Sequence, residues 1–207
     1  MAAFRREYLG GRERERLAIL DLGSQDINGS YRPLFAEPAW RYLGVDMAPG
    51  NNVELVLRDP YLWNEIAPGS IDVIISGQTF EHTEFFWLTM QQIARALKPG
   101  GICCILAPSS GPEHRFPVDC WRIYPDGFRA VARYAGLETL QATTQWDDLS
   151  EYDSESNKWH DSTLVARKPD TSPNARLAGP ARWLRWLADR LDRRKPRVQA
   201  QPPTLSS

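Results

Sequence analysis

Three acidic residues stand where short apolar runs of the chain end. The runs begin at residues 17, 40 and 53, and the acids that follow them are Asp21, Asp46 and Asp59. Such runs are typical of buried strands in a parallel sheet. In open α/β sheets, ligands bind outside the carboxyl ends of the strands, and an acid after a later strand accepts hydrogen bonds from ribose hydroxyls. The sequence therefore predicts a nucleoside site within residues 17–59; the alternative is that Asp21 and Asp46 only cap helices or turns.

The turn after the first run indicates which kind of nucleoside would fit. Its residues are Gly23-Ser24-Gln25-Asp26, and the phosphate-binding pattern G-x-G-x-x-G is absent because Gln25 occupies the second glycine position. Asp26 adds negative charge beside the turn, which would repel a pyrophosphate. A nucleoside that carries a cationic sulfonium group would not be repelled.

The remaining pattern predicts an α/β fold with a doubly wound, mostly parallel sheet, a C-terminal antiparallel strand and an appended amphipathic helix. Further strands are expected at residues 70–76, 101–107, 137–144 and 161–166, and helices at 84–97 and 125–134. We expect a short helix between Asn28 or Ser30 and Pro38, with Pro33 in its first turn. Residues 1–16 are interpreted as a solvated helix or an irregular lead-in.

Composition separates the C-terminal tail from the rest of the 207-residue chain. Residues 170–207 contain eight Arg or Lys and three Asp, although the whole chain has a formal net charge of −1. We therefore predict a catalytic domain at residues 1–168, followed at 169–207 by a linker, a basic amphipathic helix and a disordered tail. No apolar run is long enough to span a membrane and no signal peptide is evident, so a cytoplasmic protein is expected.

At this point the residues resemble a known family. Asp21-Leu-Gly23-Ser24-Gln25-Asp26 and Gly44-Val-Asp46-Met47 are similar to the cofactor motifs of class I S-adenosylmethionine-dependent methyltransferases, with Gln25 in place of a glycine. The type 11 group of that family also resembles this chain in Phe80-Glu81-His82 and in Leu97-Lys98-Pro99-Gly100-Gly101. The resemblance implies that Asp21 helps to hold the turn, that Gly23 lets the cofactor approach backbone and that Asp46 binds the ribose. Asp59 matches, more weakly, the acid that meets the adenine amino group, and the alternative is an ordinary turn aspartate. The implied cofactor-binding residues are Asp21, Gly23, Ser24, Gln25, Asp46, Met47, Arg58, Asp59, Gln78, Thr79 and Phe80.

Histidines are the candidate catalytic residues. Methyl transfer requires alignment, and a hydroxyl acceptor also requires a base, for which histidine is suited near neutral pH. His82 follows the fourth strand and His114 lies in the segment 111–128, which is expected over the cofactor mouth; His82 is alternatively a structural or cofactor-contacting residue. The candidate acceptor-binding residues are Glu113, Arg115, Asp119, Trp121, Arg122 and Tyr124, and the alternative is an internally bonded loop with Arg122 and Asp119 paired.

The same segment resembles methyltransferases that accompany glycosyltransferases in bacterial surface-polysaccharide and glycolipid synthesis, which implies a sugar hydroxyl as acceptor. Residues 181–195 are expected to contact a membrane peripherally, at its inner face, or to pack on the domain or on a second subunit. The acidic core argues against nucleic acid as substrate. No metal site is predicted, because no ligand spacing stands out. Alternatives are a catalytically inactive binding subunit and a methyltransferase for another small-molecule class.

Overall fold

The computed structural model describes residues 1–27, 29–150 and 152–170, and residues Met1–Asp170 form one compact unit. The expected amphipathic helix, its membrane or subunit contacts and the disordered tail lie outside the described residues and stay predictions. Among the described residues, no helix has both the length and the hydropathy that a membrane span requires.

The core of this unit is a seven-stranded sheet in the order β3-β2-β1-β4-β5-β7-β6. The β7 strand runs antiparallel to its neighbours β5 and β6, and the other neighbouring pairs are parallel. This arrangement confirms the predicted doubly wound sheet with its C-terminal antiparallel strand. The strands are β1 (Ala18–Leu22), β2 (Arg41–Asp46), β3 (Leu55–Val56), β4 (Ile71–Gly77), β5 (Leu97–Pro108), β6 (Glu138–Thr144) and β7 (Asp161–Arg167).

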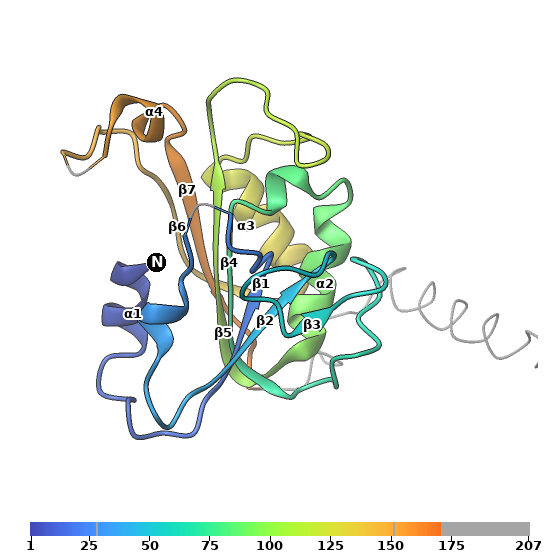
Figure 1. The fold of residues 1–207 in the computed structure, drawn as a ribbon. Coiled ribbons are helices and arrows are strands. Elements are labelled where there is room, and N and C mark those ends of the chain that lie inside the picture. Colours follow the sequence, from blue (N-terminus) through green and yellow to red (C-terminus); the bar gives the residue numbers. More distant parts are fainter. Residues whose placement is uncertain (28, 151, 171–207) are drawn as a thin grey trace, which may run out of the picture. The chain divides into compact units, whose positions relative to one another are not determined.

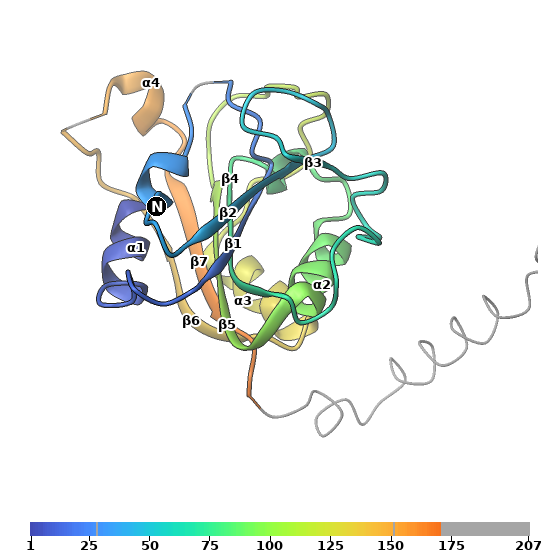
Figure 2. The ribbon, with the colours of Figure 1, turned by 60° about the horizontal axis from the view of Figure 1, so that its bottom comes forward.

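Both faces of the sheet are buried, because consecutive side chains of a strand point to opposite faces and the central strands are apolar at both positions. On β1, Leu20 packs into a core beneath the helices α2 (Phe86–Ala96) and α3 (Pro125–Tyr134). Its neighbour Ile19 packs into a second core on the opposite face. Figures 1 and 2 show α2 and α3 on one side of the sheet and α1 on the other.

The second face is covered by the N-terminal segment, contrary to the expectation of a solvated lead-in. The helix α1 (Ala2–Tyr8) buries Phe4, and the following Leu9 is fully buried against the same core. The charged residues 11–16 obscured this apolar face, because only Phe4 on the helix and Leu9 just after it supply its buried residues. The sequence prediction was therefore wrong about how α1 is used.

Two further elements are shorter than most elements of the fold. The short helix expected between β1 and β2 forms as a single 3-10 turn, η1 (Arg32–Phe35), with Pro33 near its start. The run 53–57 pairs only over the two residues of β3. By contrast, α2 and α3 form close to the predicted bounds, and α3 ends where Gly136 adopts a φ of +78°.

The carboxyl ends of the parallel strands meet at one edge of the sheet. The turn after β1, the loop after β2 and the 3-10 turn η2 (Phe80–His82) after β4 lie at this edge. A long loop, residues 109–124, connects β5 to α3 over the same edge (Figure 1). We refer to residues 21–26 as the donor turn and to residues 109–124 as the lid. A short helix, α4 (Ser154–Asn157), precedes β7.

The three cysteines are free thiols. Cys103 and Cys104 are fully buried in β5, one on each face of the sheet, and burial raises the pKa of each thiol to about 12. Cys120 lies exposed on the lid.

Candidate functional site

Gly23 sets the shape of the donor turn. Its φ is +74°, and a Cβ added there would lie 2.0 Å from the Thr79 Oγ1 atom. Its backbone N–H and that of Ser24 both donate to the Val45 carbonyl, at 2.8 and 3.2 Å. The turn is therefore held between the end of β2 and the loop after β4, in a conformation that a glycine adopts without strain.

Asp21 is buried at the end of β1 and is not an exposed ligand group. Its side chain is 3% exposed and accepts a hydrogen bond from the Tyr42 hydroxyl on the neighbouring strand β2. Burial, opposed by that hydrogen bond, raises the pKa of the Asp21 carboxyl to about 7. The support of the turn that the resemblance implied for Asp21 stays a prediction.

Asp46 presents a carboxylate at the end of β2, where a ribose acceptor was expected. Its Oδ2 atom accepts from the Gln25 backbone N–H at 3.1 Å, and Oδ1 accepts from the Met47 and Ala48 N–H groups at 2.7 and 3.3 Å. The carboxylate is partly exposed, and Oδ2, which accepts only one of these bonds, retains a lone pair. Three backbone donors thus orient a carboxylate that can accept a further hydrogen bond from a diol.

The residues after β3 lie on the surface. Asp59 is exposed, and its Oδ1 atom accepts from the Tyr61 N–H at 2.7 Å, which is the bond of a turn aspartate. The Arg58 side chain is 93% exposed, and its Nε lies 3.7 Å from the Glu65 carboxylate. The adenine contact suggested for Asp59 stays a prediction.

The three candidate residues after β4 differ in what they offer a ligand. Gln78 has a φ of 55°, and its amide nitrogen donates to Asp161 at 2.8 Å. The Thr79 hydroxyl donates to the Leu22 carbonyl at 3.3 Å and packs on Gly23. Phe80 is fully buried in the core beneath η2. Its side chain therefore packs the core, and only its backbone could meet a cofactor.

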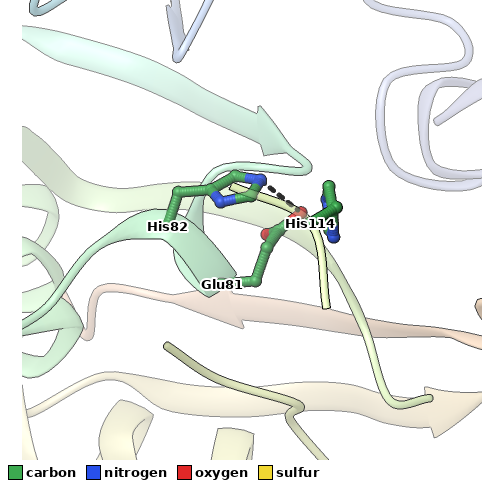
Figure 3. A group of neighbouring side chains, drawn as sticks. All are labelled: Glu81, His82 and His114. Carbon is green, nitrogen blue, oxygen red and sulfur yellow. Dashed lines mark ion pairs between the residues drawn. The ribbon is translucent and has the colours of Figure 1, made fainter. Parts of the chain in front are cut away.

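The structure brings both candidate catalytic histidines together with a carboxyl group (Figure 3). His82 and His114 have ring centroids 4.7 Å apart, in an edge-on arrangement. Nε2 of His82 lies 3.7 Å from Oε1 of Glu81, and one ligand atom from each of the three residues lies within 4.8 Å of the others. His82 and Glu81 come from η2, whereas His114 comes from the lid, so the contact joins two loops of the same sheet edge.

Glu81 is fully buried, and neither of its carboxyl oxygens has a hydrogen-bond partner among the described residues. Desolvation raises its pKa to about 8. The same cause lowers the pKa of His82, opposed by a hydrogen bond between its Nδ1 and the Val118 carbonyl, at 2.6 Å. The buried surroundings of Glu81 and His82 therefore favour uncharged forms of both groups.

The lid is closed on itself by an ion pair, as one sequence alternative proposed. Both terminal nitrogens of Arg122 donate to the Asp119 carboxylate, at 2.6 and 2.8 Å, and Oδ2 of Asp119 also accepts from the His114 N–H at 2.7 Å. The hydrogen bonds from Arg122 hold the pKa of Asp119 well below its usual range. Glu113 and Arg115 form a second pair on the lid, but both are exposed. Asp119 and Arg122 thus shape the lid and position His114.

Aromatic side chains border the cluster. Phe116 is 63% exposed, and its ring lies edge-on to His82 and His114, with centroids 6.0 and 6.4 Å away. Trp121 donates its indole N–H to the Thr83 and Glu84 carbonyls, at 3.1 and 3.2 Å. Tyr124 is exposed and stacks on Trp146.

Sequence reasoning missed two residues of this region. Glu81 was noted only as part of a motif, although its position next to His82 was a signal that could have been used. Phe116 carried no local signal, because its place beside the histidines depends on how the lid folds. Gly111 shows the same dependence, since a Cβ there would lie 2.2 Å from the Trp159 ring.

Residues 20–105 of the chain match the family model described as a methyltransferase domain. This stretch, less than half of the chain, is similar to that domain. It contains the donor turn, Asp46 and the Glu81-His82 pair, whereas the lid follows it in the sequence.

Among curated proteins, an uncharacterized methyltransferase from Mycobacterium avium (strain 104) is similar to this chain. The two are 28% identical over 132 residues, which cover 56% of this chain and 49% of that protein. The chain spans about half the length of the curated relatives it matches. These relatives support a methyltransferase assignment without indicating an acceptor.

Solved structures agree on the fold. The 1,6-didemethyltoxoflavin-N1-methyltransferase of Burkholderia thailandensis, with S-adenosylhomocysteine bound, has a TM-score of 0.61 at 16% identity, over 82% of this chain and 76% of that one. Phosphoethanolamine N-methyltransferase 2 of Haemonchus contortus, in complex with S-adenosyl-L-methionine, has a TM-score of 0.58 at 17% identity, over 81% and 51% of the two chains. The described part of the chain thus has the Rossmann-like fold of these two methyltransferases.

Proposed function

We propose that this protein transfers a methyl group from S-adenosylmethionine to a hydroxyl of a small polar acceptor, most simply a sugar. The observation that carries the proposal is the position of His82. It lies one 3-10 turn after Thr79, which packs on Gly23 of the donor turn, and it faces His114 of the lid. A proton acceptor therefore stands between the expected donor site and the loop that borders the acceptor site.

The donor set at the sheet edge fits S-adenosylmethionine. The oriented Asp46 carboxylate suits the ribose diol, and the tight turn at Gly23 leaves backbone for the amino-acid end of the cofactor. Asp26, exposed beside the turn, makes the site unfavourable for a pyrophosphate. When bound, S-adenosylmethionine supplies a methyl group on a positively charged sulfur.

The role of His82 in the reaction follows from its hydrogen bond to Val118. A carbonyl can only accept, so Nδ1 carries the proton and Nε2 carries a lone pair. As the acceptor oxygen forms its bond to the methyl carbon, the carbon–sulfur bond breaks and its electron pair stays on sulfur. The hydroxyl proton passes to Nε2 of His82, with His114 as the alternative base.

The aromatic border of the lid supports a sugar as acceptor. Phe116 and Tyr124 expose more than half of their surface, and aromatic faces pack well against the C–H surfaces of sugar rings. The resemblance of the lid to methyltransferases of polysaccharide and glycolipid synthesis points in the same direction. Because the two structural neighbours are named as N-methyltransferases, an amine is the competing acceptor class.

Titration calorimetry of the full chain with S-adenosylmethionine tests the donor half of the proposal. We expect saturable binding by the wild type and at least tenfold weaker binding by Asp46→Ala, because the ribose loses its acceptor. The control variant is Asp126→Asn on α3, where the side chain is 97% exposed, and it should bind as the wild type does. Absence of binding by the wild type would favour an inactive binding subunit.

Transfer of labelled methyl groups tests the acceptor half. A panel of hydroxylated glycosides and a matched panel of amines are offered to the wild type, His82→Ala, His114→Ala and His160→Ala. We expect glycosides to be labelled, and turnover to fall in one of the first two variants while cofactor binding persists. Full turnover in both would exclude a histidine base, and labelling of amines alone would exclude the hydroxyl.

A further inference from the structure

We infer that Glu81, His82 and His114 form a binding site for one divalent first-row transition-metal ion. Metal binding itself follows from the geometry of the three side chains; its chemical role rests on the proposed function. The inference departs from the sequence analysis, where no ligand spacing was visible because the third ligand lies on a different loop.

The distances between the ligand atoms of the three side chains would suit a metal ion if they became slightly shorter. Two ligands on a tetrahedral ion, each about 2.1 Å from the metal, lie roughly 3.4 Å apart. Nε2 of His82 and Oε1 of Glu81 are already 3.7 Å apart, and the ligand atoms of all three residues lie within 4.8 Å of one another. The lid holds His114 through its backbone N–H, so a rotation of the His114 side chain could shorten the remaining distances between ligand atoms.

His82 is oriented as metal-binding histidines usually are. Such residues donate the N–H of the other ring nitrogen to a carbonyl or carboxylate, which fixes the tautomer and directs the free lone pair at the ion. Nδ1 of His82 donates to the Val118 carbonyl at 2.6 Å, so the lone pair is on Nε2, the atom that faces Glu81 (Figure 3).

Glu81 supplies an independent argument. A fully buried carboxyl group without a hydrogen-bond partner is costly, and a bound cation is one of the few arrangements that compensates it. The nearby cation does not do so, because both terminal nitrogens of Arg122 are bonded to Asp119. Nδ1 of His114 is also buried and without a hydrogen bond, and it lies 3.4 Å from Oδ2 of Asp119. The oxygens of Glu81 are therefore the unused ligand atoms of the group.

The ligand types indicate which ions would bind. Two imidazoles and one carboxylate suit Zn²⁺, Co²⁺ or Fe²⁺, whereas Mg²⁺ and Ca²⁺ prefer sites made of oxygen ligands. Three protein ligands leave coordination positions open for the acceptor. An ion there would lower the pKa of the acceptor hydroxyl, and the histidines would then act as ligands instead of as the proton acceptor.

Cobalt spectroscopy on the untagged full chain tests the site. The protein is stripped with a chelator, dialysed and titrated with Co²⁺ while its visible absorption is recorded. We expect one tightly bound Co²⁺ per chain, with absorption bands typical of four or five nitrogen and oxygen ligands. Glu81→Gln and His114→Ala should each weaken binding at least tenfold, in line with losses of 10–100-fold for less direct changes around metal ligands.

Two variants serve as controls. His160→Ala removes the remaining histidine, whose Nδ1 lies 3.1 Å from the Gln145 carbonyl, away from the cluster. Cys120→Ser removes the exposed thiol, the competing soft ligand. Both should bind Co²⁺ as the wild type does, and thermal unfolding of each metal-free variant shows whether it is folded.

The inference is overturned if the wild type binds no Co²⁺, if Cys120→Ser abolishes binding, or if folded His114→Ala binds as tightly as the wild type. Titration of the stripped protein with S-adenosylmethionine separates this result from the proposed function. Cofactor binding without Co²⁺ binding rejects the metal alone, and Co²⁺ binding without cofactor binding rejects the proposed methyl transfer alone.

Discussion

The donor turn and the lid lie at the same sheet edge but differ in one kind of bond. In the donor turn, Gly23 and Ser24 donate to the Val45 carbonyl, and three N–H groups orient the Asp46 carboxylate. The lid also has backbone bonds, from Cys120 and Trp121 to the Glu81 carbonyl, but it contains in addition the buried ion pair of Asp119 and Arg122.

This difference matches the work that each region is proposed to do. A donor site that always binds one cofactor gains from backbone contacts, which tolerate changes in neighbouring side chains. An acceptor site gains from side chains, because substitutions there alter the shape that the loop presents. The two regions should therefore respond to different substitutions, and the predictions below test that separation.

The largest effect is expected from Gly23→Ala. The new Cβ would lie 2.0 Å from Thr79 Oγ1 at a residue with φ of +74°. Left-handed strain of about 1 kcal/mol and overpacking of about 2 kcal/mol should together lower the free energy of unfolding by roughly 3 kcal/mol. Chemical denaturation measures this loss, and calorimetry should show that cofactor binding is lost with it.

Gly11→Ala is the matched control. Gly11 has a φ of +86° but has no atom within 4 Å of an added Cβ, so only the strain of about 1 kcal/mol should appear. Combining Gly23→Ala with Thr79→Ala should recover part of the loss, because the second change removes the atoms that clash. Equal losses in Gly23→Ala and Gly11→Ala would show that the close contact with Thr79 does not constrain the turn.

An intermediate effect is expected from Asp119→Ala on the lid. The Asp119 side chain is 3% exposed, and its loss leaves the His114 N–H and the Arg122 guanidinium without their acceptor. We expect acceptor turnover to fall at least tenfold and the free energy of unfolding to fall by about 2 kcal/mol. Cofactor affinity, measured by calorimetry, should change less than twofold.

Glu113→Ala removes a carboxylate from the other ion pair of the lid. Because Glu113 and Arg115 are 64% and 72% exposed, their pair should contribute little, and neither turnover nor stability should change measurably. If Asp119→Ala weakened cofactor binding as strongly as it lowered turnover, the donor turn and the lid would be one coupled unit and the comparison would fail.

Elements with a strong local pattern could be predicted from the sequence, and elements that depend on distant partners could not. The apolar runs of β1, β4 and β5 are buried on both faces, so their pattern alone indicates a parallel sheet. The helix α1 was misjudged because Phe4 and Leu9 are buried only by contact with the far side of the sheet. No local signal separated η1 from an α-helix.

The residues of the candidate site also fall into those that could be predicted from the sequence and those that could not. Asp46 and His82 could be placed because each follows a strand, and strand ends converge at a known edge of the fold. The cluster of Glu81 with His114 could not be placed, since His114 is carried there by a loop whose course depends on Asp119 and Arg122. Spacing in the sequence carries no information about such a contact.

The smallest effect is expected from Asp59→Asn, which tests how far the donor site extends. Asp59 is exposed and its Oδ1 atom accepts from the Tyr61 N–H, a bond that an asparagine side chain can replace. If Asp59 is only a turn residue, the dissociation constant for S-adenosylmethionine should change less than twofold, whereas Asp46→Asn should raise it several-fold because the ribose acceptor loses its charge. If calorimetry showed a tenfold weaker affinity of Asp59→Asn for S-adenosylmethionine with protein stability unchanged, the adenine contact of Asp59 would be supported. The donor site would then depend on this exposed side chain as well as on backbone.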